Sequence, residues 1–486
     1  MNLDLFIPEL TLAAFAVLVI VLDLFISQKT VLRSVSLAGL VIAGGVAIAM
    51  WGEDYPAIFN NMLAVDSYAL FFKVLFAGIA FLVILASADY VSKLERFQGE
   101  YYALILLSTL GMMLMAATAD LISLYISLEL TSISLYILVG FLKDRKSTEA
   151  SLKYLLLGAV ASAVLLYGMA LVFGYTGETQ LGAIAAVIQS MSLDSILDSP
   201  ALLMGIVLLV AGFGFKIAAV PFQMWVPDVY EGAPTPVTAY LSVASKAAGF
   251  AIILRVFHSA FGLPEWLSSN WGMIFAVLAV ISMIIGNVVA IPQSNIKRML
   301  GYSSIAQAGY LMVGLAVVGF SPAAEVVGRS SLLFFLASYA LTNLGAFTAI
   351  IAISNKVGSD LIQDYSGMGK RAPLLALALT LCLISLIGMP PAAGFMAKFY
   401  IFSGAVQNDL LWLVIIAVIN SVISAYYYLR VVKVMWLGKP ASEGKVPSSG
   451  ALRLALSLSC LGVLLLGVIP GYIMKLAEMA AKMFAF

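Results

Sequence analysis

The sequence has few charged residues, and this shortage indicates the class of protein. Charged residues make up 10% of the 486 positions, hydrophobic residues make up 63%, and the mean hydropathy is +1.06. A soluble domain carries about 25% charged residues. The composition therefore predicts an integral membrane protein. The formal net charge of +1 indicates neither a nucleic-acid surface nor an acidic partner.

Cysteine and histidine are almost absent, which argues against redox centres. Cys382 and Cys460 both lie in apolar runs, and an iron–sulfur cluster needs about four thiolates. His258 is the single histidine, so a haem with two histidine ligands cannot form within this chain. The sequence also has no G-x-x-x-x-G-K-[ST] loop and no strand-linked G-x-G-x-x-G. We predict no metal, cofactor or nucleotide site in this chain.

Long apolar runs fill most of the sequence. A spanning helix needs roughly 20 apolar residues, so the runs predict an all-α polytopic fold with about 14 transmembrane helices. The start of the chain lacks the basic segment and cleavage site of a signal peptide, and we predict that it is the first span. The run at 180–192 is too short to span and predicts an interfacial helix or loop. The predicted spans are 4–26, 33–51, 67–92, 101–117, 121–142, 151–174, 201–225, 236–257, 271–291, 302–320, 330–353, 373–401, 409–437 and 451–474.

Lysine and arginine are distributed unevenly between the predicted loops. Of 26 such residues, five lie inside spans, 17 in loops after odd-numbered helices or at the span ends beside them, and four in or beside the other loops and tails. Cytoplasmic loops are enriched in these residues. The odd-numbered loops are therefore predicted to be cytoplasmic, with both termini on the outer side.

Two predicted helices are interrupted by proline. The seventh reads "GFGFKIAAVPFQMW" and contains Pro221, and the twelfth reads "SLIGMPPAAGFMAKFYIF" and contains Pro390 and Pro391. Broken helices at matching places in two halves are typical of inverted-repeat transporters. Since the two helices are five apart, we predict two inverted five-helix repeats, helices 4–8 and 9–13. The predicted units are residues 1–100, 101–260, 261–440 and 441–486.

Five charged residues fall inside predicted spans where charge is expensive. A charge at a helix centre costs about 2.5–3.5 kcal/mol, so five would cost roughly 12–18 kcal/mol before pairing and water recover part of it. Glu129 lies about 12 Å into its helix and Lys246 about 15 Å into its own, at 1.5 Å per residue. The candidate site residues are Glu129, Lys153, Lys216, Lys246 and Lys398.

These residues have a functional and a structural interpretation. Burial can bring a lysine pKa from about 10.4 to near 7, where the ammonium exchanges protons at working pH. A helix break beside such a lysine frees carbonyls that can hold water or ions. The alternative is a set of ion pairs that hold helices together, although buried charge stabilises a bundle poorly. Lys153 stands near the start of its span and could instead reach the surface.

At these residues the chain resembles a known family. It is similar to the proton-translocating, antiporter-like membrane subunits of respiratory complex I, the NADH–quinone oxidoreductase of bacteria. "PDVYEGAPTPVTAYLSVASK" points to the wider family, and "EASLKY" and "YYYLRVVKVM" lean towards its N type. Other stretches that carry the likeness are "LYISLELTSISLYILVGF", "NIKRMLGYSSIAQAGYLMVGL" and "SLIGMPPAAGFMAKFYIF".

The resemblance implies roles for the five charged residues. Glu129 corresponds to a glutamate that modulates the pKa of the lysine at the first break, which is Lys216 here. Protons would pass Lys246 and enter or leave through Lys398, while Lys153 corresponds to a lysine of N-type members. Relatives often have histidine at Gln223 and Gln307. Glutamine cannot titrate, so at these two positions it can only order water.

The resemblance also implies the surroundings of the chain. Partner subunits would carry NADH, FMN, iron–sulfur clusters and quinone, and the neighbours would be K-type and M-type subunits in a prokaryotic plasma membrane. The chain would be a non-redox subunit of a translocase. Three alternatives stay open: a subunit of an Mrp-type cation/proton antiporter, a relative of complex I that takes electrons from ferredoxin or the deazaflavin F420H2, and a purely structural anchor.

Overall fold

The computed structural model describes residues 3–26, 30–53, 55–92, 94, 97–192, 196, 199–320, 325–439, 444 and 448–482. These residues are overwhelmingly helical, and they contain isolated bridges but no strand. The elements are η1 (Leu3–Phe6), α1 (Ile7–Phe25), α2 (Thr30–Ala49), α3 (Ser67–Ala86), α4 (Ala88–Val91), α5 (Gln98–Ala117), α6 (Leu121–Val139), α7 (Arg145–Thr176), α8 (Leu181–Ser190), α10 (Pro200–Ile217), α11 (Trp225–Gly232), α12 (Thr235–Tyr240), η2 (Leu241–Ser245), α13 (Lys246–Phe261), α14 (Glu265–Ala290), α15 (Ile296–Phe320), α16 (Glu325–Val357), η4 (Ile362–Tyr365), α17 (Met368–Arg371), α18 (Pro373–Ile387), α19 (Ala393–Val406), α20 (Leu411–Leu437), α21 (Gly450–Val468) and α22 (Gly471–Lys482).

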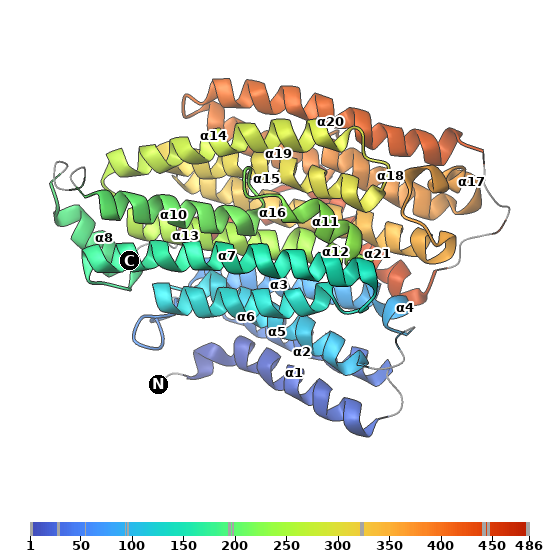
Figure 1. The fold of residues 1–486 in the computed structure, drawn as a ribbon, viewed down its shortest axis with the longest axis horizontal. Helices are drawn as coiled ribbons and strands as arrows, with labels where there is room; N and C mark the ends of the chain where they lie inside the picture. The colour runs from blue at the N-terminus through green and yellow to red at the C-terminus, as the bar shows by residue number, and fades with distance from the viewer. Residues whose placement is uncertain are drawn as a thin grey trace.

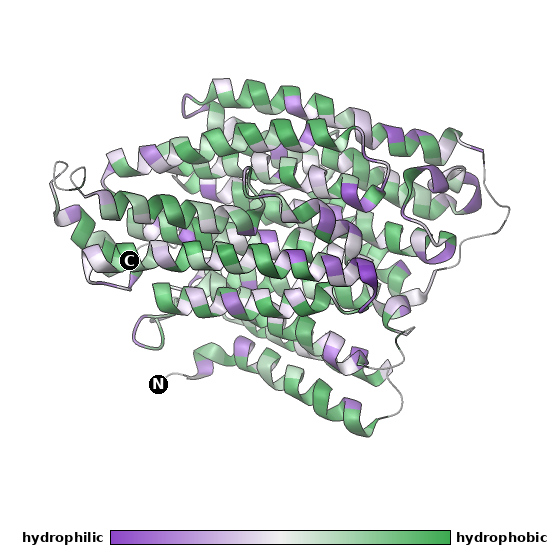
Figure 2. Cartoon of the chain, in the orientation of Figure 1, coloured by the Kyte–Doolittle hydropathy of each residue, from purple (hydrophilic) through white to green (hydrophobic). Residues whose placement is uncertain are grey.

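The long helices lie side by side along the horizontal axis of Figure 1 and form one bundle. Thirteen helices of the described chain are long and apolar enough to cross a membrane. Hydrophilic residues gather towards the helix ends and the connecting loops in Figure 2, as a bilayer-spanning bundle requires. The prediction of an all-α polytopic membrane protein is confirmed, and the run at 180–192 forms the short helix α8.

The twelfth predicted span, 373–401, is present as two half-helices. The break predicted at Pro390 and Pro391 is present, because α18 ends at Ile387 and α19 begins at Ala393. Each half is too short to span alone. The predicted span 201–225 is also interrupted, because α10 ends at Ile217 and α11 begins at Trp225. Both breaks fall where the prolines predicted them.

The two breaks share a local geometry. The last helical residue is isoleucine in both, Ile217 and Ile387. The next residue is left-handed, with φ of +62° at Ala218 and +91° at Gly388. In each chain segment a proline stands four residues after the isoleucine. Left-handed residues end helices because they turn the chain out of the helical path.

Several helices begin earlier than the apolar runs indicated. The span predicted at 151–174 begins at Arg145, and the one predicted at 302–320 begins at Ile296. Polar first turns were assigned to loops, but capping extends the helix: Asp144 accepts a 2.7 Å hydrogen bond from the Ser147 N–H at the start of α7. At the other end, the span predicted at 451–474 ends at Val468, and a separate helix, α22, follows.

α15 runs through the middle of the bundle and is the helix around which the site is built. Its spanning window is 94% buried. It packs closely on α14 because glycines face each other: a Cβ on Gly319 would stand 2.5 Å from the Gly272 Cα. The π-helical turn η2 interrupts the neighbouring buried span immediately before Lys246. π-turns within helices are frequent at functional sites.

Candidate functional site

Lys216 lies in the last turn of α10, at the first break. Its side chain is 4% exposed, and its Nζ donates a 2.9 Å hydrogen bond to Ser132 Oγ on α6. The Trp225 indole N–H, from the far side of the break, donates to the Phe215 carbonyl at 3.0 Å. At the break, Lys216 therefore lies beside the Ser132 hydroxyl, and the Trp225 hydrogen bond joins the two sides of the break.

Glu129 lies one turn before Ser132 on α6, so the two side chains share a face of that helix. Ser162 on α7 donates a hydrogen bond to Glu129 Oε1. Glu129 acts electrostatically on Lys216, but no ion pair joins these two described side chains. The predicted modulation of Lys216 by Glu129 stays a prediction.

Lys246 is the first residue of α13 and is only 1% exposed. Its Nζ donates to both Ser304 oxygens on α15, with 2.8 Å to Oγ. The Ser304 hydroxyl is also 3.2 Å from the Tyr230 hydroxyl on α11. One serine thus joins Lys246 to the segment that follows the first break.

Lys398 lies on α19, after the second break, and is 5% exposed. Its Nζ donates to the carbonyls of Leu386 and Ile387 at 3.2 and 2.9 Å, and to Ser421 Oγ at 2.9 Å. The ammonium also lies 4.2 Å from the centre of the Tyr310 ring, a cation–π distance. The carbonyls freed by the break therefore hold the lysine itself.

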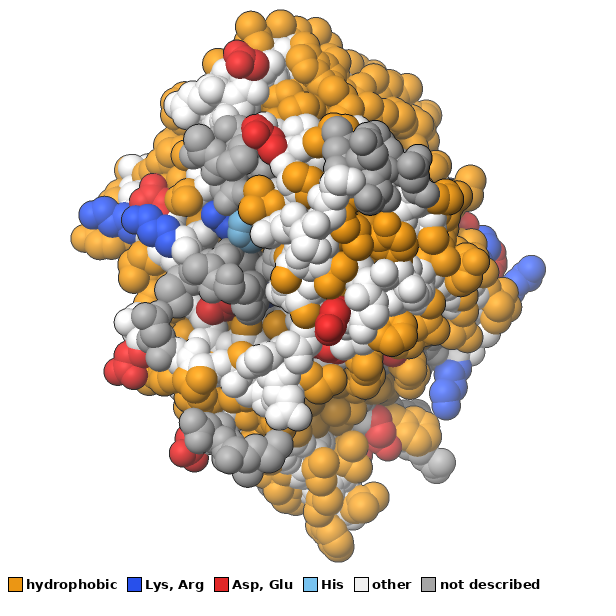
Figure 3. All heavy atoms as spheres, turned by 90° about the vertical axis from the view of Figure 1, so that its left-hand side faces the viewer, with side chains coloured by type: hydrophobic (Ala, Val, Ile, Leu, Met, Phe, Trp, Pro, Cys, Tyr) orange, Lys and Arg blue, Asp and Glu red, His pale blue; other side chains and the backbone are white. Residues whose placement is uncertain are grey.

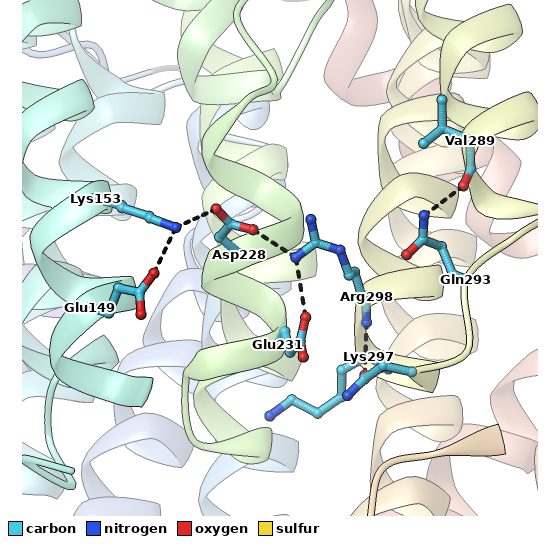
Figure 4. A network of polar contacts seen from close by, with 9 residues as sticks. Glu149, Lys153, Asp228, Glu231, Val289, Gln293, Lys297 and Arg298 are labelled. Atoms are coloured by element: carbon cyan, nitrogen blue, oxygen red, sulfur yellow. Dashed lines mark hydrogen bonds and ion pairs between the residues drawn. The ribbon is translucent and has the colours of Figure 1, made fainter. Parts of the chain in front are cut away.

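Lys153 is not buried with the other three lysines. It is 43% exposed and forms ion pairs with Asp228 at 2.7 Å and Glu149 at 2.9 Å. Arg298 binds the other Asp228 oxygen at 2.6 Å and also Glu231 at 3.1 Å, as Figure 4 shows. Partial burial would raise the pKa of Asp228, but the hydrogen bonds and charges of Lys153 and Arg298 lower it overall. These groups line a polar cavity of about 230 Å³.

The three buried lysines share one property that a fourth buried lysine lacks. Lys73 is also 1% exposed, but it forms a 2.8 Å ion pair with Glu9. Among the described residues, no carboxylate forms an ion pair with Lys216, Lys246 or Lys398; their partners are hydroxyls and carbonyls. A buried pair is expected to remain fixed, whereas an ammonium with neutral partners can lose its proton without leaving a carboxylate behind.

The two glutamines where relatives often have histidine differ in their contacts. Gln307 Nε2 donates 3.1 Å to the Leu386 carbonyl, the same oxygen that accepts from Lys398. Gln223 Oε1 is buried and has no hydrogen-bond partner among the described residues. Gln307 thus belongs to the surroundings of Lys398.

Sequence reasoning missed a buried ion pair that is not part of this lysine series. Arg255, counted with the loops, is fully buried in α13 and binds both Asp66 oxygens at 2.6 and 2.9 Å. Asp66 also caps α3 through the Ala69 N–H. The available signal was a capping aspartate before a span, but the pairing over 189 residues has no local trace. Arg329 Nη1 lies 2.8 Å from His258 Nε2. At the end of the molecule that is on the left of Figure 1, the charged side chains of the described residues are scattered over the surface and form no single patch (Figure 3).

The comparisons with known proteins agree with this architecture. A family model described as NADH:quinone oxidoreductase/Mrp antiporter, TM, matches residues 118–424. The chain is 54% identical over 484 residues to NADH-quinone oxidoreductase subunit N of Dehalococcoides mccartyi and 45% identical over 486 residues to the subunit N of Desulforamulus reducens, covering 99% of each chain in both pairs.

Solved structures show the same fold. A chain of respiratory complex I from Thermus thermophilus has a TM-score of 0.81 and 32% identity, with 97% of this chain and 99% of that chain covered. A chain of the Mrp complex from Dietzia has a TM-score of 0.85 with 99% and 97% covered, but at 21% identity it supports the fold alone. The chain belongs to the family of NADH-quinone oxidoreductase subunit N, the antiporter-like membrane subunits of complex I.

Proposed function

We propose that the chain is the proton-translocating N subunit of a NADH–quinone oxidoreductase. Within that translocase it holds no redox group, and quinone reduction elsewhere in the complex drives proton transfer through it. One observation carries the proposal. Lys216 and Lys398 are buried at the two helix breaks and Lys246 is buried after the π-helical turn η2, and the described partners of all three are uncharged.

The geometry supports a relay in which each lysine holds or releases one proton. Lys216 would load while the negative charge of Glu129 lies nearby, and would unload when that influence weakens. Lys246 would pass the proton on, since Ser304 joins it to Tyr230 on one side of α15. Lys398 would exchange it at the second break, where the Leu386 and Ile387 carbonyls replace lost solvation. Pro221, Pro390 and Pro391 keep both helices open at these points.

The two halves would be inverted repeats, residues 101–260 and 261–440. The matching breaks at Ile217 and Ile387 support this division, because each stands in the fourth helix of its half. Flanking units would be residues 1–100 and 441–486. Lys153 stays a predicted site residue, although its ion pairs set it apart from the buried lysines.

The partners follow from the proposed complex. NADH, FMN, iron–sulfur clusters and quinone would lie in other subunits, and K-type and M-type membrane subunits would flank this chain. The bacterial relatives support a prokaryotic plasma membrane, and the uneven lysine and arginine distribution supports both termini on the outer side.

A Lys216→Ala variant of the assembled complex tests the relay. NADH-driven reduction of a ubiquinone analogue and proton pumping should both fall, by about 100-fold for loss of a proton-transfer group, while the complex still assembles. The matched control is the double variant Glu9→Gln with Lys73→Met, which removes a buried lysine together with its paired carboxylate. That control should pump normally. Normal pumping by Lys216→Ala would overturn the relay.

Purification of the tagged native chain in mild detergent separates this proposal from its alternatives. Co-elution of flavin- and cluster-bearing subunits with inhibitor-sensitive NADH–quinone activity supports it. The same subunits with activity only from ferredoxin or F420H2 would keep the relay and change the electron donor. Sodium-dependent transport without redox partners would instead identify an Mrp-type antiporter.

A further inference from the structure

The short helix α11 follows the first break and contacts the immediate surroundings of two buried lysines. At its start, the Trp225 indole donates to the Phe215 carbonyl, one residue before Lys216. Near its end, the Tyr230 hydroxyl meets Ser304, which binds Lys246. The inner face of α11 therefore touches the neighbours of both lysines.

The buried side chains of α11 pack against α7 on one side and α15 on the other. The Trp225 ring stacks on Tyr154 of α7 with centroids 4.6 Å apart. On the other side, Gly301 of α15 lies against Pro227 and Tyr230, and a Cβ there would be 3.5 Å from either residue. A shift of α11 against α7 or α15 would therefore change these contacts.

The two acidic side chains of α11, Asp228 and Glu231, are partly exposed and form ion pairs with neighbouring helices. They are three residues apart and lie on the same side of the helix. Lys153, the residue before Tyr154, binds Asp228 from α7, and Arg298, three residues before Gly301, binds it from α15 (Figure 4). Asp228 thus joins α11 to both α7 and α15 through ion pairs.

We propose that Asp228 is a positioning residue whose ion pairs with Lys153 and Arg298 hold α11 in place and so set the positions of Lys216 and Lys246. On this inference Lys153 acts through Asp228 and carries no proton itself. The inference rests on the proposed function, since it concerns the placing of its relay.

The exposure of the paired side chains indicates that these ion pairs contribute little to the stability of the fold. Asp228 and Arg298 are each about one-third exposed and Lys153 more so, and ion pairs at that exposure contribute little to folding. Variants that break them should still assemble. Because the pKa of Asp228 is lowered from its ordinary value, its carboxylate is ionised at every pH from 6 to 8, and the pairs should persist unchanged over that range.

A double-variant cycle in the assembled complex tests the inference. Lys153→Met, Asp228→Asn and the double variant are compared for NADH-driven proton uptake into vesicles and for reduction of a ubiquinone analogue, between pH 6 and 8. We expect Asp228→Asn to lower proton uptake about fivefold and Lys153→Met about threefold, as loss of a weak ion pair predicts. The double variant should equal Asp228→Asn alone, with no change in the shape of the pH profile.

Three controls accompany the cycle. Asp228→Glu keeps the charge and should restore most of the uptake. Lys146→Met removes a lysine from the same cavity and helix that makes no ion pair with a described carboxylate, and it should pump normally. Lys246→Ala, measured alongside, reports on the relay itself.

The outcomes are separable. A double variant near the product of the single effects, about 15-fold, or a pH profile shifted by Lys153→Met, would overturn the inference and return Lys153 to the relay. Normal uptake by Asp228→Asn would overturn the inference while a defective Lys246→Ala keeps the proposed function. Normal uptake by Lys246→Ala would instead overturn the proposed function.

Discussion

Each of the two broken helices contains a buried lysine, but the two lysines have different hydrogen-bond partners. Lys216 precedes its break and depends on another helix, where Ser132 binds its Nζ and Glu129 stands one turn away. Lys398 follows its break and is held by the carbonyls of that break, with Ser421 as a third partner. We therefore expect the first lysine to respond to movement of a neighbouring helix, whereas the second takes two of its three hydrogen-bond partners from its own broken helix.

The number of partners gives the largest expected contrast between the two sites. Ser132→Ala removes the one described hydrogen-bond partner of Lys216, whereas Ser421→Ala leaves Lys398 with two carbonyls. A hydrogen bond to a charged group contributes about 1.5–3 kcal/mol. We expect proton pumping to fall about tenfold in Ser132→Ala and about two- to threefold in Ser421→Ala. Equal effects, measured as proton uptake into vesicles, would remove the distinction.

The influence of Glu129 should be confined to the first site. Glu129→Gln is expected to lower turnover about fivefold, because it removes the charge that acts on Lys216. The decrease should be absent in a Lys216→Ala background and should remain complete in a Ser421→Ala background. Quinone reduction rates of the three single and two double variants, normalised to assembled complex, give the comparison. A full Glu129→Gln effect without Lys216 would place the target of Glu129 elsewhere.

The smallest expected difference concerns the two glutamines. The Leu386 carbonyl accepts hydrogen bonds from both Gln307 and Lys398. Gln307→Leu removes the first of these, and it should lower proton pumping about twofold. Gln223→Leu removes an amide oxygen with no described partner and should leave pumping unchanged. A larger loss in Gln223→Leu than in Gln307→Leu would reverse the assignment.

Local signals in the sequence predicted much of this arrangement. Apolar runs predicted the helices, prolines predicted both breaks, and charge inside the runs predicted the five candidate residues, because each of these depends on neighbouring residues or on the bilayer. The contacts of Lys153 could not be predicted in the same way. Asp228 is 75 residues away, and helix packing alone brings it to Lys153. The π-helical turn before Lys246 likewise had no local mark in the sequence. The separate helix α22 did have one, because Pro470 and Gly471 interrupt the apolar run that was predicted as a single span.

The ratio of protons taken up to electrons transferred tests the central claim most directly. The measurement uses Lys246→Ala in the complete complex, reconstituted into vesicles, with NADH and a ubiquinone analogue. Lys246 is the most deeply buried of the three relay lysines and lies between the two breaks in sequence. The relay predicts that pumping falls with quinone reduction, or that the proton-to-electron ratio falls where reduction persists. Unchanged reduction with an unchanged ratio would contradict it.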